Sequence, residues 1–151
     1  MSRVKRLLVV ILIVAFGLLC VSGCEKKEPT IDRKAITKEI GVDVTAGKER
    51  YANIFEADSG NVLSTIVYED NALEELVKDA EHWKALPMDS EFAELLQNII
   101  PNAEEGYYYF RNMDKKADDK YDTAVITERS RKYIVSVYDV KKMVLYYVEV
   151  K

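Results

Sequence analysis

Histidine, cysteine and proline are scarce in this chain of 151 residues, which has one histidine, two cysteines and three prolines. A single histidine excludes metal sites built from several imidazoles, and two cysteines exclude a framework of several disulfides. Basic residues are not in excess either, since 22 Lys and Arg stand against 26 Asp and Glu. A chain without a basic surplus lacks the electrostatic footprint of nucleic-acid binding, so we expect no nucleic-acid partner.

The patterns of common hydrolases are also missing. No serine stands in a Gly-x-Ser-x-Gly turn, and Ser-x-x-Lys does not begin at Ser59, Ser64, Ser90, Ser130 or Ser136. A glycosidase needs two carboxylates across a deep cleft, for which a domain of this size has little room. We therefore expect no catalytic residue, no cofactor and no enzymatic activity.

The segment 114–122 is the best candidate for cation binding, because it holds four aspartates. It lacks the D-x-D-x-D-G order of a calcium loop, and Lys115, Lys116 and Lys120 oppose a divalent ion. We expect a solvated loop and no metal site, and the sequence leaves open whether this loop binds a cation.

The amino terminus has the pattern of an export signal. Arg3, Lys5 and Arg6 precede the apolar run 7–19, which at 1.5 Å per residue is about 20 Å long and too short to span a bilayer. Val21-Ser22-Gly23-Cys24 follows, and this stretch resembles the lipobox of bacterial lipoproteins. The resemblance implies a signal peptide over 1–23, cleavage before Cys24, and a diacylglycerol thioether on Cys24 with acyl chains such as palmitate.

Lipidation would place the protein on the extracytoplasmic face of the cell membrane, with residues 24–30 as lipid-bearing cysteine and tether. Loss of the leader leaves 19 basic and 26 acidic residues, a formal charge of −7. Two or three acyl chains anchor firmly, because one chain alone gives marginal binding.

Residues 31–151 predict a single α+β domain. We expect a first helix capped by Thr30 and ended by Gly41, a second from the cap Asn71 with Glu74 as its capping-box partner, and a third between Asp89 and Pro101. His82 and Trp83 are expected at the end of the second helix, with Trp83 more often packed in a core than used for stacking on a ligand. His82 is expected to be an exposed cation near that helix end rather than a general base.

Alternating patterns predict an antiparallel sheet of about four strands, at 62–68, 107–111, 132–138 and 143–150, with the last two joined as a C-terminal β-hairpin. Residues 42–60 stay ambiguous. Because helices fill the first two thirds of the domain and strands the last third, we expect the helices on one side of the sheet.

The C-terminal part of the chain has a recognisable pattern of aromatic segments. They are Glu105-Gly106-Tyr107-Tyr108-Tyr109-Phe110, Ser136-Val137-Tyr138-Asp139 and Leu145-Tyr146-Tyr147-Val148-Glu149, together with His82-Trp83-Lys84-Ala85-Leu86-Pro87. It resembles small uncharacterised secreted or lipid-anchored proteins of Gram-positive bacteria over roughly residues 60–151. That family carries no activity to transfer, so the resemblance implies compartment and fold only.

The tyrosines are the best sequence candidates for a binding surface. Adjacent tyrosines in a strand point to opposite faces, so one face would present phenol rings to a partner. Tyr108, Tyr138 and Tyr147 are the expected contacts; the alternative is a sheet stiffened by cross-strand aromatic pairs.

We therefore predict a membrane-anchored, non-enzymatic binding module for an envelope protein or peptide. The alternatives are a ligand- or toxin-sequestering lipoprotein of the immunity type, and a small hydrolase.

Overall fold

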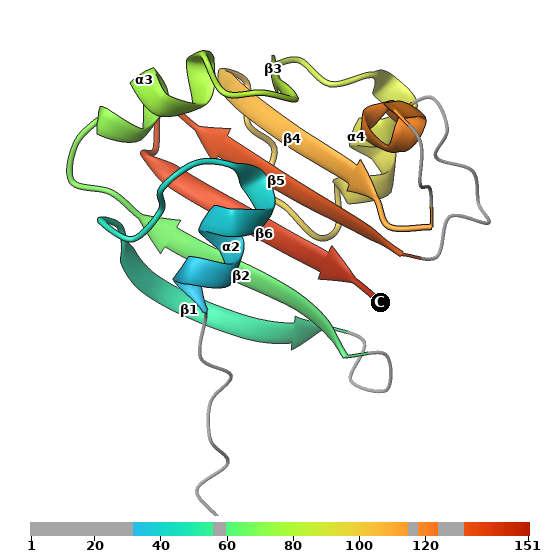
Figure 1. The fold of residues 1–151 in the computed structure, drawn as a ribbon, viewed down its shortest axis with the longest axis horizontal. Helices are drawn as coiled ribbons and strands as arrows, with labels where there is room; N and C mark the ends of the chain where they lie inside the picture. Colours follow the sequence, from blue (N-terminus) through green and yellow to red (C-terminus); the bar gives the residue numbers. More distant parts are fainter. Residues whose placement is uncertain (1–31, 56–59, 115–117, 124–131) are drawn as a thin grey trace, which may run out of the picture.

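A computed structural model describes residues 32–55, 60–114, 118–123 and 132–151 of the chain. Within these ranges, six strands form one antiparallel sheet in the order β1-β2-β6-β5-β4-β3 (Figure 1). The strands are β1 (Lys48–Phe55), β2 (Asn61–Val67), β3 (Trp83–Ala85), β4 (Gly106–Asn112), β5 (Tyr133–Asp139) and β6 (Val144–Val150). The helices are α2 (Arg33–Ile40), α3 (Ala72–Lys78), α4 (Ser90–Leu96) and the short 3-10 helix η1 (Asp118–Tyr121). The structure therefore confirms an α+β domain with an antiparallel sheet. Strands β1 and β3 are additional to the four strands that the sequence predicts.

The centre of the sheet is formed by β5 and β6. They pair antiparallel from Tyr133 opposite Val150 to Asp139 opposite Val144. In the connecting turn, the Asp139 carboxylate accepts hydrogen bonds from the backbone N–H and the ammonium of Lys142, at 3.0 and 2.7 Å. Every residue of β5 is buried, which is the pattern of a strand covered on both faces.

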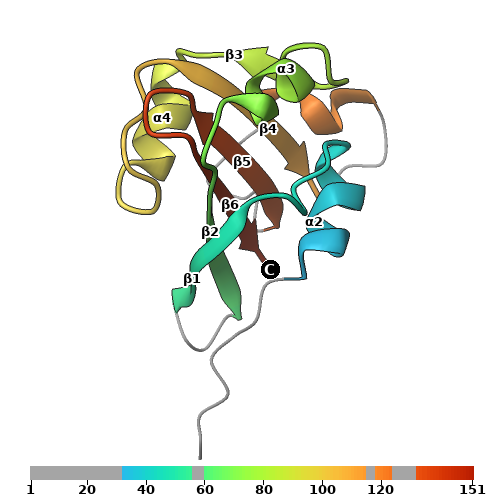
Figure 2. The same cartoon turned by 90° about the vertical axis from the view of Figure 1, so that its left-hand side faces the viewer.

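Helices cover both faces of this sheet, so the expectation that they lie on one side is wrong. Ile36 of α2 and Leu73 of α3 belong to one apolar cluster, and Phe92 of α4 belongs to a second. Neighbouring residues of β4 divide between the clusters, with Tyr109 in the first and Tyr108 in the second. Figure 2 shows α4 and α2 on opposite sides of the strands. The apolar side chains on both faces of β5 and β6 require this second layer, because either face left open would expose hydrocarbon.

The N-cap of helix α2 lies two residues later than the sequence predicts. Its N-cap is Asp32, whose carboxylate accepts hydrogen bonds from the backbone N–H groups of Lys34 and Ala35, at 3.1 and 3.0 Å. The expected cap Thr30 lies outside the described residues. Gly41 ends the helix at φ 71°, as predicted, since glycine adopts the left-handed conformation without steric cost.

Strand β1 lies within the segment 42–60, which the sequence left ambiguous. Just before this strand, the backbone at Gly47 passes close to side chains of the following part of the chain. A Cβ at Gly47 would lie 2.4 Å from Cγ2 of Ile66 and 2.7 Å from Cζ of Tyr68. Only glycine therefore lets the chain cross these side chains on its way into β1.

Helix α3 is shorter than predicted, and the expected capping box does not form. Asn71 is the N-cap but makes no side-chain cap hydrogen bond; the backbone N–H of Ala72 donates instead to the Asp70 carboxylate at 3.1 Å. The helix ends at Lys78, and His82 at φ 66° turns the chain into the edge strand β3, where Trp83 pairs with Tyr109. His82 therefore lies directly before a strand and Trp83 lies in it, and neither is at a helix end.

Candidate functional site

The structure buries the three tyrosines expected to form a binding surface. Relative exposure is 5% for Tyr108, 0% for Tyr138 and 7% for Tyr147. Tyr108 lies against Phe92 of α4, and Tyr138 meets Tyr68 edge-on, both with ring centroids about 6 Å apart. The expected tyrosine surface is therefore wrong, because helices cover both faces of the sheet.

Burial also raises the pKa of these phenols. It raises the pKa of Tyr138 to about 12, with the nearby carboxylates of Glu74 and Asp70 acting in the same direction. Desolvation likewise raises the pKa of Tyr108 and Tyr147. All three stay protonated at neutral pH and act as core side chains.

The structure confirms the prediction that Trp83 packs in the core. Its indole N–H donates to the backbone carbonyl of Ile40, the last residue of α2, at 2.9 Å. Its ring also lies near that of Tyr109, with centroids 6.0 Å apart. The side chain thus ties the edge of the sheet to the end of a helix.

His82 is an exposed residue, as expected, but its imidazole packs on another ring. It stacks on Tyr121 of η1 with centroids 3.5 Å apart and planes inclined by 11°. Its Nε2 lies 3.2 Å from the Glu81 carboxylate. This arrangement holds η1 beside the turn that leads into β3.

A polar cluster that the sequence did not reveal joins α2 to β4. The Glu39 carboxylate accepts hydrogen bonds from Nε and Nη2 of Arg111, the latter at 2.7 Å, and from the Tyr109 hydroxyl at 3.3 Å. Both charged groups are largely buried. With every group paired inside the cluster, its role is to position α2.

The acidic segment 114–122 is described only in part. Residues 115–117 lie outside the described ranges, and residues 118–121 form η1. Across the described ranges, no group of three or more His, Cys, Asp or Glu side chains is placed to hold a metal ion.

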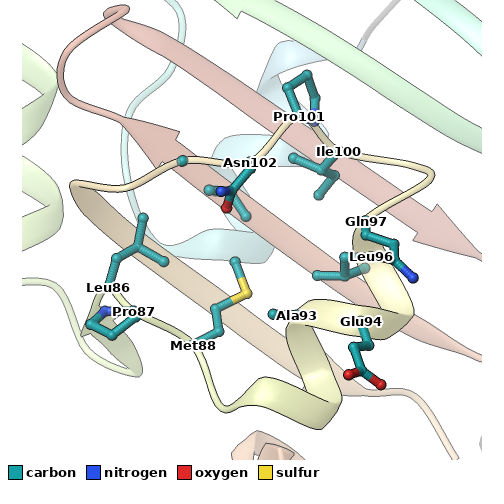
Figure 3. A pocket seen from close by; sticks show the side chains of 12 residues that line it. Leu86, Pro87, Met88, Ala93, Glu94, Leu96, Gln97, Ile100, Pro101 and Asn102 are labelled. Atoms are coloured by element: carbon teal, nitrogen blue, oxygen red, sulfur yellow. The ribbon is translucent and has the colours of Figure 1, made fainter.

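A surface groove of about 370 Å³ lies beside α4 (Figure 3). Its walls are the segment 86–88 before the helix, the helix itself, and the segment 100–103 after it. Figure 3 shows Met88 and Asn102 pointing into the groove from opposite sides. Val137, a buried residue of the central strand β5, also lines it.

Hydrocarbon dominates the groove lining, and polar groups are few. The apolar part includes Leu86, Met88, Ala93, Leu96 and Ile100. The polar side chains are one carboxylate and two amides, those of Glu94, Gln97 and Asn102. An apolar cavity with a few polar groups is the usual composition of a ligand site, and its volume falls within the range of about 300–1,000 Å³ typical of such sites.

The sequence analysis missed this groove because a predicted helix between Asp89 and Pro101 does not show which of its apolar side chains stay open to solvent. Phe92 and Leu96 are buried, whereas Leu95 is 42% exposed. The available signal was in the flanking segments, where Leu86, Met88 and Ala103 are apolar although they lie outside helices and strands.

Two other pockets are smaller. One of about 210 Å³ lies between the 43–48 segment and α3, and is edged by Asp43, Lys48 and Asp70. The other, of about 220 Å³, is lined by Lys141 and Lys142, whose ammonium groups already bind Glu104 and Asp139. The groove beside α4 exceeds both in volume, so that groove is the candidate site.

The lipidation candidate Cys24 and the predicted leader 1–23 lie outside the described residues. No helix in the described ranges is long and apolar enough to cross a membrane. Comparison with protein-family models, with curated proteins and with solved structures found no match.

Proposed function

We propose that this protein is a lipid-anchored extracytoplasmic lipoprotein whose domain binds a protein or peptide of the cell envelope without chemical turnover. The observation that carries the binding function is the apolar groove of about 370 Å³ beside α4. The anchoring proposal depends on the sequence alone, through the lipobox-like Val21-Ser22-Gly23-Cys24.

The lining of the groove supports binding rather than catalysis. Its polar groups are one exposed carboxylate and two amides, which can orient a partner by hydrogen bonds. Acyl or glycosyl transfer would need an activated nucleophile or a second carboxylate, and the lining supplies neither group.

The tether length fits a partner that also lies at the membrane. Seven residues separate Cys24 from Asp32, the N-cap of α2. Fully extended, they span about 25 Å. A lipid on Cys24 would thus keep the domain close to the bilayer surface, where envelope proteins are concentrated.

A small-ligand-sequestering lipoprotein is the second candidate, favoured by the same apolar lining. The two are distinguished by thermal unfolding, because a small ligand that binds only the native state raises the melting temperature by mass action. A partner protein is instead detected by crosslinking, which joins residues that lie close together.

Photocrosslinking in intact cells tests the binding function. A photoreactive amino acid replaces Gln97, an exposed residue of the groove, in the full-length protein. We expect one defined crosslinked partner, which is lost when Ala93→Trp fills the groove. Ala35→Trp is the matched control, because Ala35 is also an exposed helical alanine but belongs to α2. A crosslink that survives Ala93→Trp, or none at all, would contradict binding of an envelope protein through the groove.

A further inference from the structure

The groove beside α4 is built from a stretch of chain without basic residues. Between Lys84 and Arg111 the sequence contains five acidic residues and no lysine, arginine or histidine. Three of the acids, Asp89, Glu91 and Glu94, lie at the start of α4 or within it. Asp89 and Glu91 lie at the amino end of the helix, where its partial positive charge offsets theirs, whereas Glu94 lies nearer the carboxyl end.

Among the described residues, the acids of this stretch differ in how far they are paired. Glu104 and Glu105 lie 3.2 and 3.8 Å from the ammonium of Lys141. Asp89 accepts a hydrogen bond from the Thr123 hydroxyl at 2.7 Å. Glu91 and Glu94 are exposed, and no ion pair within the described ranges reaches either of them.

Among the described residues that line the groove, Glu94 alone carries a charge. On the opposite side, Lys142 lies 3.4 Å from the carbonyl of Asn102 and also binds Asp139. The α4 side of the groove thus has one unpaired carboxylate, and the Asn102 side carries paired charges of both signs.

We propose that the occupant of this groove is a cationic peptide segment of a partner protein. Its apolar side chains enter the space beside Met88 and Leu96, and a basic side chain meets Glu94. This inference rests on the proposed function and names the chemistry of its partner. Charge complementarity carries it, because an apolar groove alone would accept any apolar side chain, whereas the unpaired Glu94 carboxylate in its lining selects for positive charge.

Binding of defined peptides to the full protein tests the inference. The protein is reconstituted in nanodiscs of zwitterionic phosphatidylcholine, so that the lipid surface does not attract charge. The probes are a short fluorescent peptide of alternating leucine and lysine and the same peptide with serine or glutamate in place of lysine. Fluorescence anisotropy then gives each Kd at low and at high salt.

We expect the lysine peptide to bind most tightly and the glutamate peptide least, with a difference that shrinks as salt rises. Ala93→Trp should abolish binding, and Ala35→Trp should not. Glu94→Gln should weaken the lysine peptide about threefold at low salt, the effect of one exposed ion pair. Glu75→Gln, at an exposed acid of α3, is the matched control and should have no effect.

Three results would overturn the inference. They are equal affinity for the lysine and serine peptides, binding that survives Ala93→Trp, or displacement of the lysine peptide by monolauroylglycerol with no response to Glu94→Gln. Each leaves the proposed function standing if the crosslink from Gln97 still depends on Ala93. Loss of that crosslink dependence would instead contradict the proposed function itself.

Discussion

Tyrosine shows how a single residue type changes meaning between sequence and structure. Its phenol suits an exposed binding surface and a buried aromatic core equally well, because it joins a large ring to one polar atom. Tyr108 and Tyr147 belong to different apolar clusters, on opposite faces of the sheet. Their contribution is therefore to the stability of the fold.

Replacing either buried tyrosine should destabilise the protein. We expect Tyr108→Ser and Tyr147→Ser each to lower the free energy of unfolding by about 3 kcal/mol, since both remove an aromatic ring from the core. Urea denaturation measures this change. Tyr107→Ser is the control, because Tyr107 is only half-buried, and it should cost clearly less. Equal stability of all three variants would refute the burial argument.

Tyr138 should make the protein sensitive to alkali. Its pKa rises from 10.0 to about 12 on folding, so the native state holds this proton after the unfolded chain has released it. The contribution of this group to stability is then full below pH 10 and is lost between pH 10 and about 12, a fall of about 3 kcal/mol. Tyr138→Phe should reduce that fall in urea titrations across this pH range.

The same variant has a consequence at neutral pH. The buried Tyr138 hydroxyl has no hydrogen-bond partner among the described residues, and such a group costs about 1–3 kcal/mol. Tyr138→Phe should therefore not destabilise the protein at pH 7. A large loss of stability there would show that the hydroxyl has a partner.

At the scale of elements, α2 is held to the sheet by polar contacts as well as by its apolar face. Trp83 reaches the end of the helix from β3, and Arg111 reaches Glu39 from β4. Sequence separations of 43 and 72 residues make these contacts invisible to local patterns.

Trp83→Phe should loosen this attachment. The substitution keeps an aromatic ring but removes the hydrogen bond to the Ile40 carbonyl, and we expect a loss of about 1 kcal/mol. Hydrogen exchange should accelerate at the Gly41 amide, which bonds to Thr37 at the helix end. The Phe110 amide, in the central part of β4, is the internal reference. Unchanged exchange at Gly41 would show that the indole contact does not hold the helix.

At the scale of the whole molecule, anchoring and binding are separable. The anchor would act through Cys24 and the groove through α4, and these are different parts of the chain. A lipid holds the protein at the membrane because each methylene buried in the bilayer contributes about 0.8 kcal/mol. The proposed binding in the groove requires no contact with that lipid.

Cys24→Ala should therefore abolish lipid attachment without unfolding the domain. We expect unprocessed precursor that incorporates no labelled fatty acid, detected by metabolic labelling and gel mobility. Cys20→Ala is the matched control and should be processed and labelled normally. Label on the Cys24→Ala protein would refute the lipoprotein proposal.

The sequence by itself determined where most elements lie. The β2, β5 and β6 strands follow their apolar runs, and α2 ends at Gly41 because the cap depends on one residue. These features depend on neighbours in the chain, so local patterns record them.

Only the tertiary structure decided which surfaces stay open. Alternation shows that Tyr108 and Tyr109 point to opposite faces, but coverage of each face depends on where α2, α3 and α4 pack. The groove likewise needs Met88, Ile100 and Val137 to meet, although they are far apart in sequence. Burial is a property of the packed molecule, because it depends on the path of every covering segment and not on the residue that is covered.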